Sequence, residues 1–304
     1  MNLQNLRVFL KVAEFEHITR ASEELGLSQP AVTKTISSLE NEIHLKLVER
    51  QGRRIVLTHA GRVLQGYARQ IFALEREMED ALATLRNGDG GEVTLAANTT
   101  IGVYLLPPIV ARFQARFPKV KLNIAILNSQ ETVEGTLNWS LDFGLVEGDV
   151  ASLPPLLTVQ PFAHDELILV VAPNHYWSRR SVIHPEMLVD GVLLLREPGS
   201  GIREVIENRL QLHDVHIRPV LTLPNNEAIK QMVMNGVGAA IISSITVQRE
   251  LAQGSLVRVP LPELDLRPQL SLIMRKDKQL SRAAQAFCSF LLSGCSQTTE
   301  PLDR

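Results

Sequence analysis

The residues best suited to specific chemistry near the start of this 304-residue chain are short polar and basic side chains. Four of them share one side of a predicted helix: Gln29, Thr33, Lys34 and Ser37. Amide, hydroxyl and ammonium groups on a helix can reach base edges in the major groove, where Gln pairs with adenine and Lys with guanine. This face therefore predicts a helix that reads duplex DNA.

A second group of candidate residues lies between positions 98 and 226. Most carry amide, hydroxyl or guanidinium donors, and donors at helix N-termini suit a small anion. Glu147 is the exception, because a bare carboxylate repels an anion; it can orient a hydroxyl or Arg203, or bind a protonated effector. The candidate effector-binding residues are Asn98, Thr99, Thr100, Ser129, Gln130, Glu147, Ser200, Gly201, Ile202, Arg203, Asn225 and Asn226.

Two short helices joined by a tight turn must position the polar face. The first, over 19–25, stops at Gly26, and glycine is the usual residue at a left-handed helix end. Leu27 and Ser28 form the turn, and Ser28 caps a second helix that has Pro30 in its first turn. The apolar stripe of that helix consists of Val32, Ile36, Leu39 and Ile43. This is a helix-turn-helix arrangement.

Neighbouring segments complete a small DNA-binding unit. Apolar residues over 3–15 predict a third helix, and residues 47–50 and 54–58 alternate as strands around an arginine-tipped turn. Such a wing can lie along phosphates or push an arginine into the minor groove. The net charge is only −2, so the basic footprint must be local. The candidate DNA contacts are Thr19, Arg20, Ser28, Gln29, Pro30, Thr33, Lys34, Ser37, Arg50, Arg53 and Arg54.

A long proline-free stretch over 60–86 predicts one helix. Its apolar residues recur every three or four positions: Val63, Tyr67, Ile71, Leu74, Met78, Ala81 and Leu85. Such a helix can pack on its own domain, but an isolated amphipathic helix between domains more often pairs with its copy in another subunit. Dimerisation also suits paired half-sites on DNA. The segment 87–91 is a hinge by composition.

Strands and helices alternate after the hinge. We expect strands over 93–97, 120–127, 141–146, 167–172, 192–195, 219–223, 239–243 and 270–274. Helices are expected over 105–117, 131–137, 203–212, 227–235 and 283–292. This alternation predicts parallel sheets in two α/β lobes with a cleft, and crossings near 162 and 267. Ligands of such sheets bind beyond the carboxyl ends of the strands, where the candidate effector residues fall.

The motif over 21–33 closely resembles that of the LysR-type transcriptional regulators, and the resemblance extends to about residue 295. It implies an all-α-rich winged helix-turn-helix DNA-binding domain and a long linker helix, joined to a two-lobed α/β effector domain like the periplasmic binding proteins. The expected domains are 1–58, 59–88 and 89–295, with lobe I over 92–162 and 268–295, lobe II over 163–267, and a tail over 296–304.

Shorter motifs refine the resemblance. The segments 100–102, 128–130, 195–201 and 226–230 look like a subgroup that includes sulfur-oxyanion sensors and Calvin-cycle operon regulators. Ile202 stands where these relatives often have a hydroxyl residue, so one donor is missing. The expected partners are double-stranded promoter DNA, a small anionic effector, further copies of the chain as a homodimer or homotetramer, and RNA polymerase.

Other classes of protein are disfavoured. There is no Ser/His/Asp constellation or Gly-x-Ser-x-Gly motif, the turn 199–201 lacks a P-loop lysine, and His213 and His216 have no companions at metal-ligand spacing. We therefore expect no enzyme, metal or cofactor. The N-terminus lacks an export signal and no window is apolar enough for a membrane, so a cytoplasmic protein is expected. A solute-binding protein is the alternative, but it leaves the first 90 residues without a role.

Overall fold

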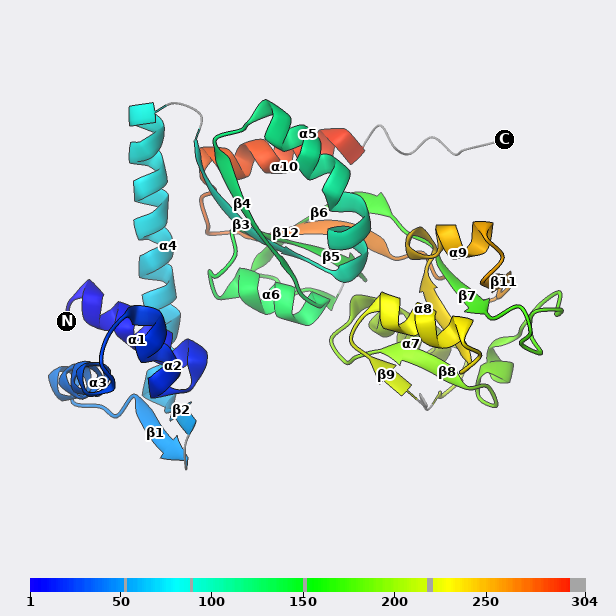
Figure 1. Cartoon of the computed structure of the whole chain (residues 1–304), viewed down its shortest axis with the longest axis horizontal. Coiled ribbons are helices and arrows are strands. Elements are labelled where there is room, and N and C mark those ends of the chain that lie inside the picture. The colour runs from blue at the N-terminus through cyan, green and yellow to red at the C-terminus, as the bar shows by residue number, and fades with distance from the viewer. Residues whose placement is uncertain (52–53, 88–89, 150–151, 218–220, 296–304) are drawn as a thin grey trace. The chain divides into compact units, whose positions relative to one another are not determined.

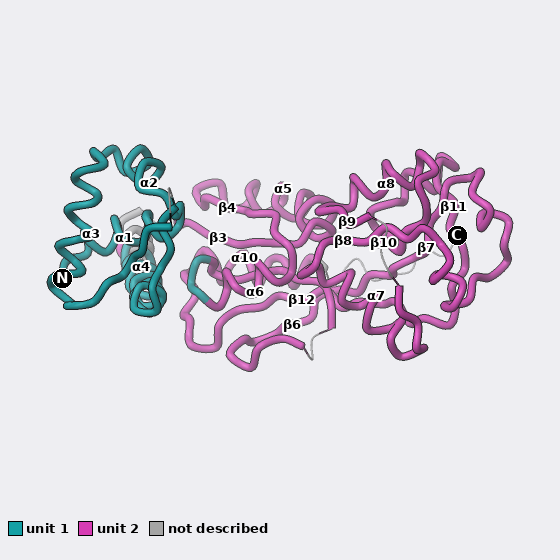
Figure 2. The backbone as a smooth tube through the Cα atoms, turned by 90° about the horizontal axis from the view of Figure 1, so that it is seen from below, with its two compact units in different colours: residues 1–79, 138–140 teal, residues 80–137, 141–304 magenta. Residues whose placement is uncertain are grey.

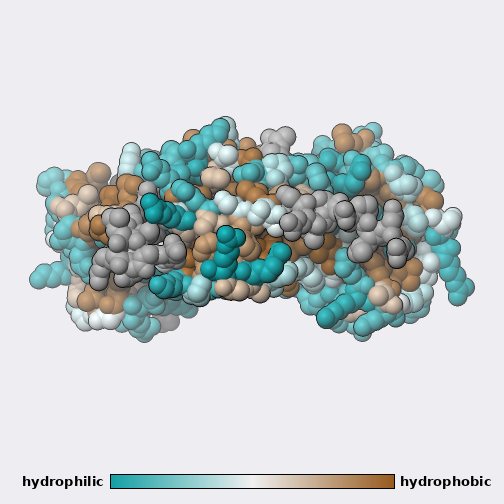
Figure 3. Space-filling model, turned by 90° about the horizontal axis from the view of Figure 1, so that it is seen from above, coloured by the Kyte–Doolittle hydropathy of each residue, from teal (hydrophilic) through white to brown (hydrophobic). Residues whose placement is uncertain are grey.

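The computed structural model describes residues 1–51, 54–87, 90–149, 152–217 and 221–295 (Figure 1). The chain divides into two compact units (Figure 2). The first comprises Met1–Glu79 with Asn138–Ser140, and the second comprises Asp80–Leu137 with Leu141–Arg304. Arg53 and the tail over 296–304 lie outside the described residues. No described helix is long and apolar enough to cross a membrane, and the face in Figure 3 mixes hydrophilic with hydrophobic residues.

The first unit is the predicted winged helix-turn-helix. Its elements are α1 (Leu3–Phe15), α2 (Ile18–Leu25), α3 (Gln29–Ile43), the hairpin β1 (Val48–Gln51) with β2 (Arg54–Leu57), and the first part of α4 (His59–Asn87). Phe9, Val12, Ala21, Val32 and Leu39 are fully buried in one core. The three helices cover one another because each contributes one apolar face.

The turn between α2 and α3 has the predicted chemistry. Gly26 adopts φ +63°, and its N–H bonds the last turn of α2. The Ser28 hydroxyl accepts a hydrogen bond of 3.3 Å from the Ala31 N–H, which caps α3. Both ends of the turn are therefore set by local residues.

The first sheet of the second unit has the strand order β4-β3-β5-β12-β6. The strands are β3 (Gly91–Ala97), β4 (Val120–Ile126), β5 (Phe143–Gly148), β6 (Leu157–His164) and β12 (Gln269–Arg275). Helices α5 (Leu106–Arg116) and α10 (Arg282–Cys295) cover one face, and α6 (Ser129–Leu137) covers the other (Figure 1). We call this layered body lobe I.

The second sheet has the order β11-β7-β10-β8-β9. The strands are β7 (Leu167–Val171), β8 (Leu193–Arg196), β9 (Leu221–Leu223), β10 (Ala239–Ser243) and β11 (Val257–Val259). The side chains of β7 alternate: Leu169 packs on the α7 side (Gly201–Gln211), whereas Val170 packs on the side of α8 (Asn226–Met234) and the short α9 (Gln248–Ala252). We call this body lobe II.

Parallel sheets were predicted, and both sheets are mixed. In lobe I, β12 runs antiparallel to both β5 and β6, and in lobe II, β7 runs antiparallel to β10 and β11. Strands β6 and β11 and helix α9 were not predicted. The reason is topological: β12 follows lobe II in the chain and enters lobe I from the crossover side, so its direction is reversed.

The helix after β3 also begins earlier than predicted. Residues 99–116 are helical, with a π-helical turn η1 over Ile101–Leu105 ahead of the start expected at residue 105. The Asn98 side chain accepts a hydrogen bond of 2.9 Å from the Ile101 N–H, so the helix starts directly at the end of the strand. A π-helical turn inside a helix frequently marks a functional site.

Two crossover segments connect the lobes. The Asp165 N–H bonds the Pro268 carbonyl at 3.0 Å, and the Leu167 N–H bonds the Leu266 carbonyl at 2.7 Å. The paired segments lie close to the crossings expected near 162 and 267. The residue-level domain limits stay predictions.

Candidate functional site

The polar face of α3 is open to solvent. Gln29, Pro30, Lys34 and Ser37 are exposed and Thr33 is half-buried, while the opposite stripe of the helix lies in the core. Ser28 is exposed at the helix start, and Arg20 is exposed on α2 beside the half-buried Thr19. These side chains are available to a ligand as large as duplex DNA. Their contacts with bases remain predictions.

Glu40, which the sequence did not single out, anchors the wing to α3. Its side chain is buried, and its Oε1 accepts hydrogen bonds from the N–H groups of Leu47 at 2.9 Å and Val48 at 3.3 Å. Lys46 Nζ lies 2.7 Å from Oε2. Burial opposes the charged form, but these donors outweigh it and hold the pKa of Glu40 below its ordinary value. The hairpin carries exposed Arg50 and Arg54, so Glu40 positions part of the basic footprint.

The apolar stripe of α4 divides between two roles. Ile71 and Phe72 pack against the helix-turn-helix core. Val63, Tyr67 and Leu74 are exposed, as are Met78 and Leu82. The side chains of Ala81 and Leu85 lie outside the described residues. One face of α4 thus packs on its own domain, as the first interpretation expects, and pairing of the exposed face with another subunit stays a prediction.

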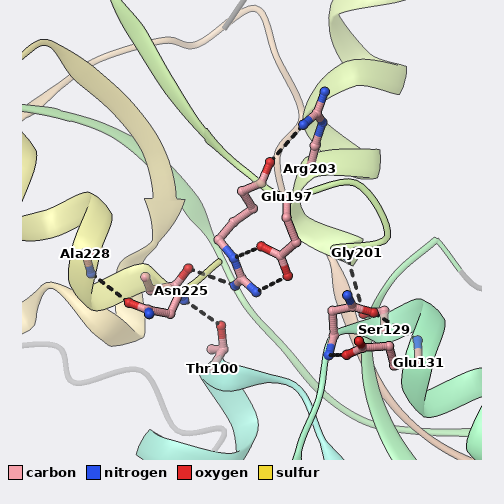
Figure 4. Close-up of polar contacts among 11 residues, drawn as sticks. Thr100, Ser129, Glu131, Glu197, Gly201, Arg203, Asn225 and Ala228 are labelled. Atoms are coloured by element: carbon pink, nitrogen blue, oxygen red, sulfur yellow. Dashed lines mark hydrogen bonds and ion pairs between the residues drawn. The ribbon is translucent and has the colours of Figure 1, made fainter. Parts of the chain in front are cut away.

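In the second unit, several candidate effector residues already bond across the two lobes. The Asn226 Nδ2 of lobe II donates to Thr100 Oγ1 of lobe I at 3.3 Å. Between α6 and the start of α7, the Gly201 N–H donates to Ser129 Oγ at 3.3 Å, and the Gln130 N–H donates to the Gly199 carbonyl at 3.0 Å. Figure 4 shows Ser129 beside Gly201. The lobes meet so closely that a Cβ on Gly201 would lie 1.7 Å from the Glu147 carbonyl oxygen.

Other candidates serve as helix caps or lie in the core. Asn225 caps α8 by accepting the Ala228 N–H at 2.7 Å. Ser200, at the N-terminus of α7, is buried, and Thr99 is half-buried. Ile202 is 2% exposed and packs in the core of lobe II, so its side chain faces away from any cleft ligand.

Glu147 does not orient Arg203. Its Oε2 accepts from Asn98 Nδ2 at 2.9 Å, and its side chain is hydrogen-bonded to that of Asp165. Burial, followed by the nearby Asp165 charge, raises the pKa of Glu147 well above its ordinary value. Arg203 instead donates to the Arg196 carbonyl at 3.0 Å and to Glu207 at 2.8 Å.

Arg196 is the cation that sequence reasoning missed. It ends β8 and is 5% exposed, and its Nη1 donates to Asn226 Oδ1 at 3.1 Å. Glu197 accepts from Nε at 2.8 Å and from Nη2 at 2.9 Å. The sequence signal was a single charged residue at the carboxyl end of an apolar strand, which is where ligands of α/β sheets bind.

Lys230 is a second buried cation, and it also joins the lobes. It is held by Glu250 at 2.8 Å, by Glu227 at 2.8 Å and by the Thr246 carbonyl at 3.1 Å. Its Nζ lies 5.8 Å from the ring centre of Tyr104 in the π-helical turn of lobe I. Burial lowers the pKa of Lys230, but its hydrogen bonds to Glu227 and Glu250 raise it further, so the group stays charged.

A hollow of about 490 Å³ opens between α6 and α7. Among the candidate effector residues, it is lined by Ser129, Gln130, Ser200 and Arg203. The volume suits a small metabolite. The N-termini of α6 and α7 therefore flank a space that a small ligand can enter, and its lining includes Pro198 and Gly199, which follow Glu197 in the chain.

Comparisons with known proteins assign the whole chain to a protein family. Residues 3–62 match the bacterial regulatory helix-turn-helix of the lysR family, and residues 86–296 match the LysR substrate binding domain. The chain belongs to the LysR family. This LysR-type regulator is 35% identical over 296 residues to the RuBisCO operon transcriptional regulator of Allochromatium vinosum, with 96% of each chain covered. The resemblance to the subgroup with Calvin-cycle regulators is confirmed.

Solved structures agree with this assignment. The regulatory domain of CcmR from Synechocystis PCC6803, determined in complex with 2-PG, is 26% identical with a TM-score of 0.62, covering 68% of this regulator and 98% of that chain. Full-length CbnR bound to its target DNA shares the fold at 22% identity and a TM-score of 0.67, covering 98% and 99%. The LysR-type regulator thus combines a DNA-binding domain with an effector-binding domain. These relatives support regulation of transcription rather than the solute-binding alternative.

Proposed function

We propose that this LysR-type regulator controls its promoter in response to a small metabolite that carries a phosphate or carboxylate group, with 2-phosphoglycolate as the first candidate. The observation that carries the proposal is the buried guanidinium of Arg196, set among hydrogen bonds that join the two lobes. Arginine is the side chain best suited to bind carboxylate or phosphate with two parallel hydrogen bonds. The 2-PG complex of the CcmR regulatory domain supports the same ligand class.

The DNA contacts proposed are those of the exposed α3 face and wing. Gln29, Thr33 and Lys34 read bases in the major groove, with Ser28, Pro30 and Ser37 alongside them. Thr19, Arg20 and the wing arginines hold phosphates or the minor groove. The exposed apolar face of α4 supports assembly as a homodimer or homotetramer, because an uncovered apolar stripe on a long helix is stabilised by a second copy.

The effector acts through the lobes in this proposal. A ligand that binds one arrangement of the lobes better shifts the population toward it, and this changes how the assembly holds DNA. The regulator contacts RNA polymerase at promoters in the cytoplasm, where the chromosome is. Neither catalysis nor a cofactor is needed for this function.

DNase footprinting of the full-length chain on its own upstream region tests the proposal. Protection is recorded without ligand, with 2-phosphoglycolate, and with glycolate as the matched control that lacks the phosphate. We expect sequence-specific protection whose extent or pattern changes only with the phosphorylated compound. Specific protection that is the same at saturating concentrations of every anion tested contradicts the effector, whereas no preference over scrambled DNA contradicts the regulator.

A further inference from the structure

The contact between Arg196 and Glu197 is unusual for two residues adjacent in the chain. Successive side chains of a strand point to opposite faces, so neighbours in β8 do not normally meet. They meet here because β8 ends at Arg196 and the chain turns at once through Pro198 and Gly199, which has φ +87°. The turn folds the Glu197 carboxylate back onto the guanidinium (Figure 4).

The two partners differ in their access to water. The Arg196 side chain is 5% exposed, whereas that of Glu197 is 21% exposed. Asn226 Oδ1 accepts a hydrogen bond from Nη1 of the guanidinium, and the two carboxylate oxygens of Glu197 accept from Nε and Nη2. This two-oxygen contact has the geometry by which arginine binds the carboxylate or phosphate of an external ligand.

We propose that the Glu197 carboxylate is a built-in substitute for the effector anion, and that effector binding exchanges Glu197 for the ligand on Arg196. This inference rests on the proposed function, since it assumes an anionic effector. A buried arginine without a counterion is strongly destabilising, so the empty regulator needs an internal carboxylate. The same carboxylate competes with the ligand for Arg196 and so lowers the apparent affinity of the regulator for the ligand.

The exchange reaches both lobes through one hydrogen-bonded chain. Arg196 Nη1 bonds Asn226 Oδ1, and the amide nitrogen of the same Asn226 bonds Thr100 Oγ1 at the start of the lobe I helix. A ligand anion that repositions the guanidinium therefore acts directly on a bond between the lobes. Glu197, whose side chain is 21% exposed, is then released from Arg196 as a free carboxylate.

The test measures binding of 2-phosphoglycolate and of inorganic sulfate to the purified full-length regulator by titration calorimetry. Glu197→Gln keeps the shape but removes the competing charge, and Glu197→Asp keeps the charge but shortens the reach. If Glu197 leaves Arg196 about one-tenth of the time, Glu197→Gln binds about tenfold more tightly than the unaltered chain. The affinity of Glu197→Asp should lie between those of the unaltered chain and Glu197→Gln, and Arg196→Gln should lose binding. Thermal unfolding is recorded for every variant. If Glu197→Gln does not fold, the affinity of Glu197→Asp is compared with that of the unaltered chain instead.

A charge-matched control separates competition from a general change in net charge. Glu186→Gln removes the same charge from an exposed site in lobe II and should leave the affinity unchanged. Equal affinity of the unaltered chain and both Glu197 variants overturns this inference alone and leaves the anionic effector standing. No binding by any variant, together with sequence-specific DNA recognition, contradicts the anionic effector and this inference with it.

Discussion

The carboxyl groups of Glu147 and Asp165 are hydrogen-bonded to each other where the chain passes from lobe I toward lobe II. Both side chains are buried, and among the described residues Glu147 Oε1 and Asp165 Oδ2 have no other hydrogen-bond partner. Two carboxylates can share a hydrogen bond only when one carries a proton. Because burial and the charge of Asp165 raise the pKa of Glu147, Glu147 is the protonated partner.

Glu147→Gln should make stability less dependent on pH. The native pKa of Glu147 lies above its unfolded value near 4.5, so the folded state holds a proton that the unfolded state releases. Stability is then lost as pH rises from about 4.5 toward the native pKa, by about 1.4 kcal/mol per pH unit for this one group. Glutamine keeps a donor toward Asp165 without a proton to lose. Urea unfolding between pH 5 and 8 measures the slope, and equal slopes for both proteins rule out the protonated pair.

Glu40→Ala should destabilise the first unit and weaken DNA binding to all sequences. The N–H of Leu47 loses its buried acceptor, which costs about 1–3 kcal/mol. The pKa of Glu40 is lowered by folding, so its stabilisation is present above its unfolded pKa and is lost as pH falls through the native value. The difference between variant and parent should therefore shrink in acid. Urea unfolding at pH 7 and pH 4 checks this, with exposed Glu24→Ala as the neutral control.

Lys34→Ala and Arg54→Ala should affect DNA binding differently. Lys34 on the exposed face of α3 is placed to read a base, so its loss should reduce discrimination by about 1–3 kcal/mol at one position. Arg54 in the wing is placed to hold the backbone, so its loss should weaken binding to every sequence and reduce the salt slope by about 1. Arg53→Ala is expected to behave like Arg54→Ala. Gel-shift titrations at two salt concentrations measure both effects, and identical behaviour of Lys34→Ala and Arg54→Ala contradicts the assignment.

Three glycine-to-alanine changes in the first unit should give three different stabilities. Gly26→Ala meets no atom within 4 Å but must hold φ +63°, which costs about 1 kcal/mol. Gly61→Ala places a Cβ 2.1 Å from the Leu47 carbonyl oxygen and should cost about 2–3 kcal/mol. Gly66→Ala lies in α4 with open space and should stabilise by about 0.5–1 kcal/mol. Thermal and urea unfolding rank the stabilities of the three variants. A destabilising Gly66→Ala would falsify the inference that a Cβ at this position meets open space.

Tyr67→Glu with Leu74→Glu should weaken self-association. Both side chains are exposed on the apolar face of α4, where a buried charge in a helix pair is strongly unfavourable. Light scattering over a concentration series should show a lower mass than for the parent. Gln65→Glu adds one negative charge about half a turn around the helix from Tyr67 and should leave the mass unchanged. An unaltered mass in the double variant shows that another surface holds the assembly together.

Local signals specified the first unit almost completely. Gly26, Ser28 and the stripe from Val32 to Ile43 act within a few residues of one another, so the turn, the cap and the buried face of α3 follow from sequence. Strand and helix alternation likewise predicted two α/β lobes. No local signal predicted the reversed direction of β12, because the direction of this strand depends on the side from which the chain re-enters lobe I after lobe II.

The sequence predicted which residue types lie at the candidate effector site, but not the hydrogen bonds that these residues form. The sequence by itself determined that donors end several strands and open several helices, since capping chemistry is local. Only the tertiary structure decided that Asn226 bonds Thr100, which is 126 positions earlier, and that Glu147 meets Asp165 across the crossover. The same folding brought Glu197 onto Arg196. Such pairs form because strand order and the crossing chains bring distant residues together, and no spacing along the chain encodes that geometry.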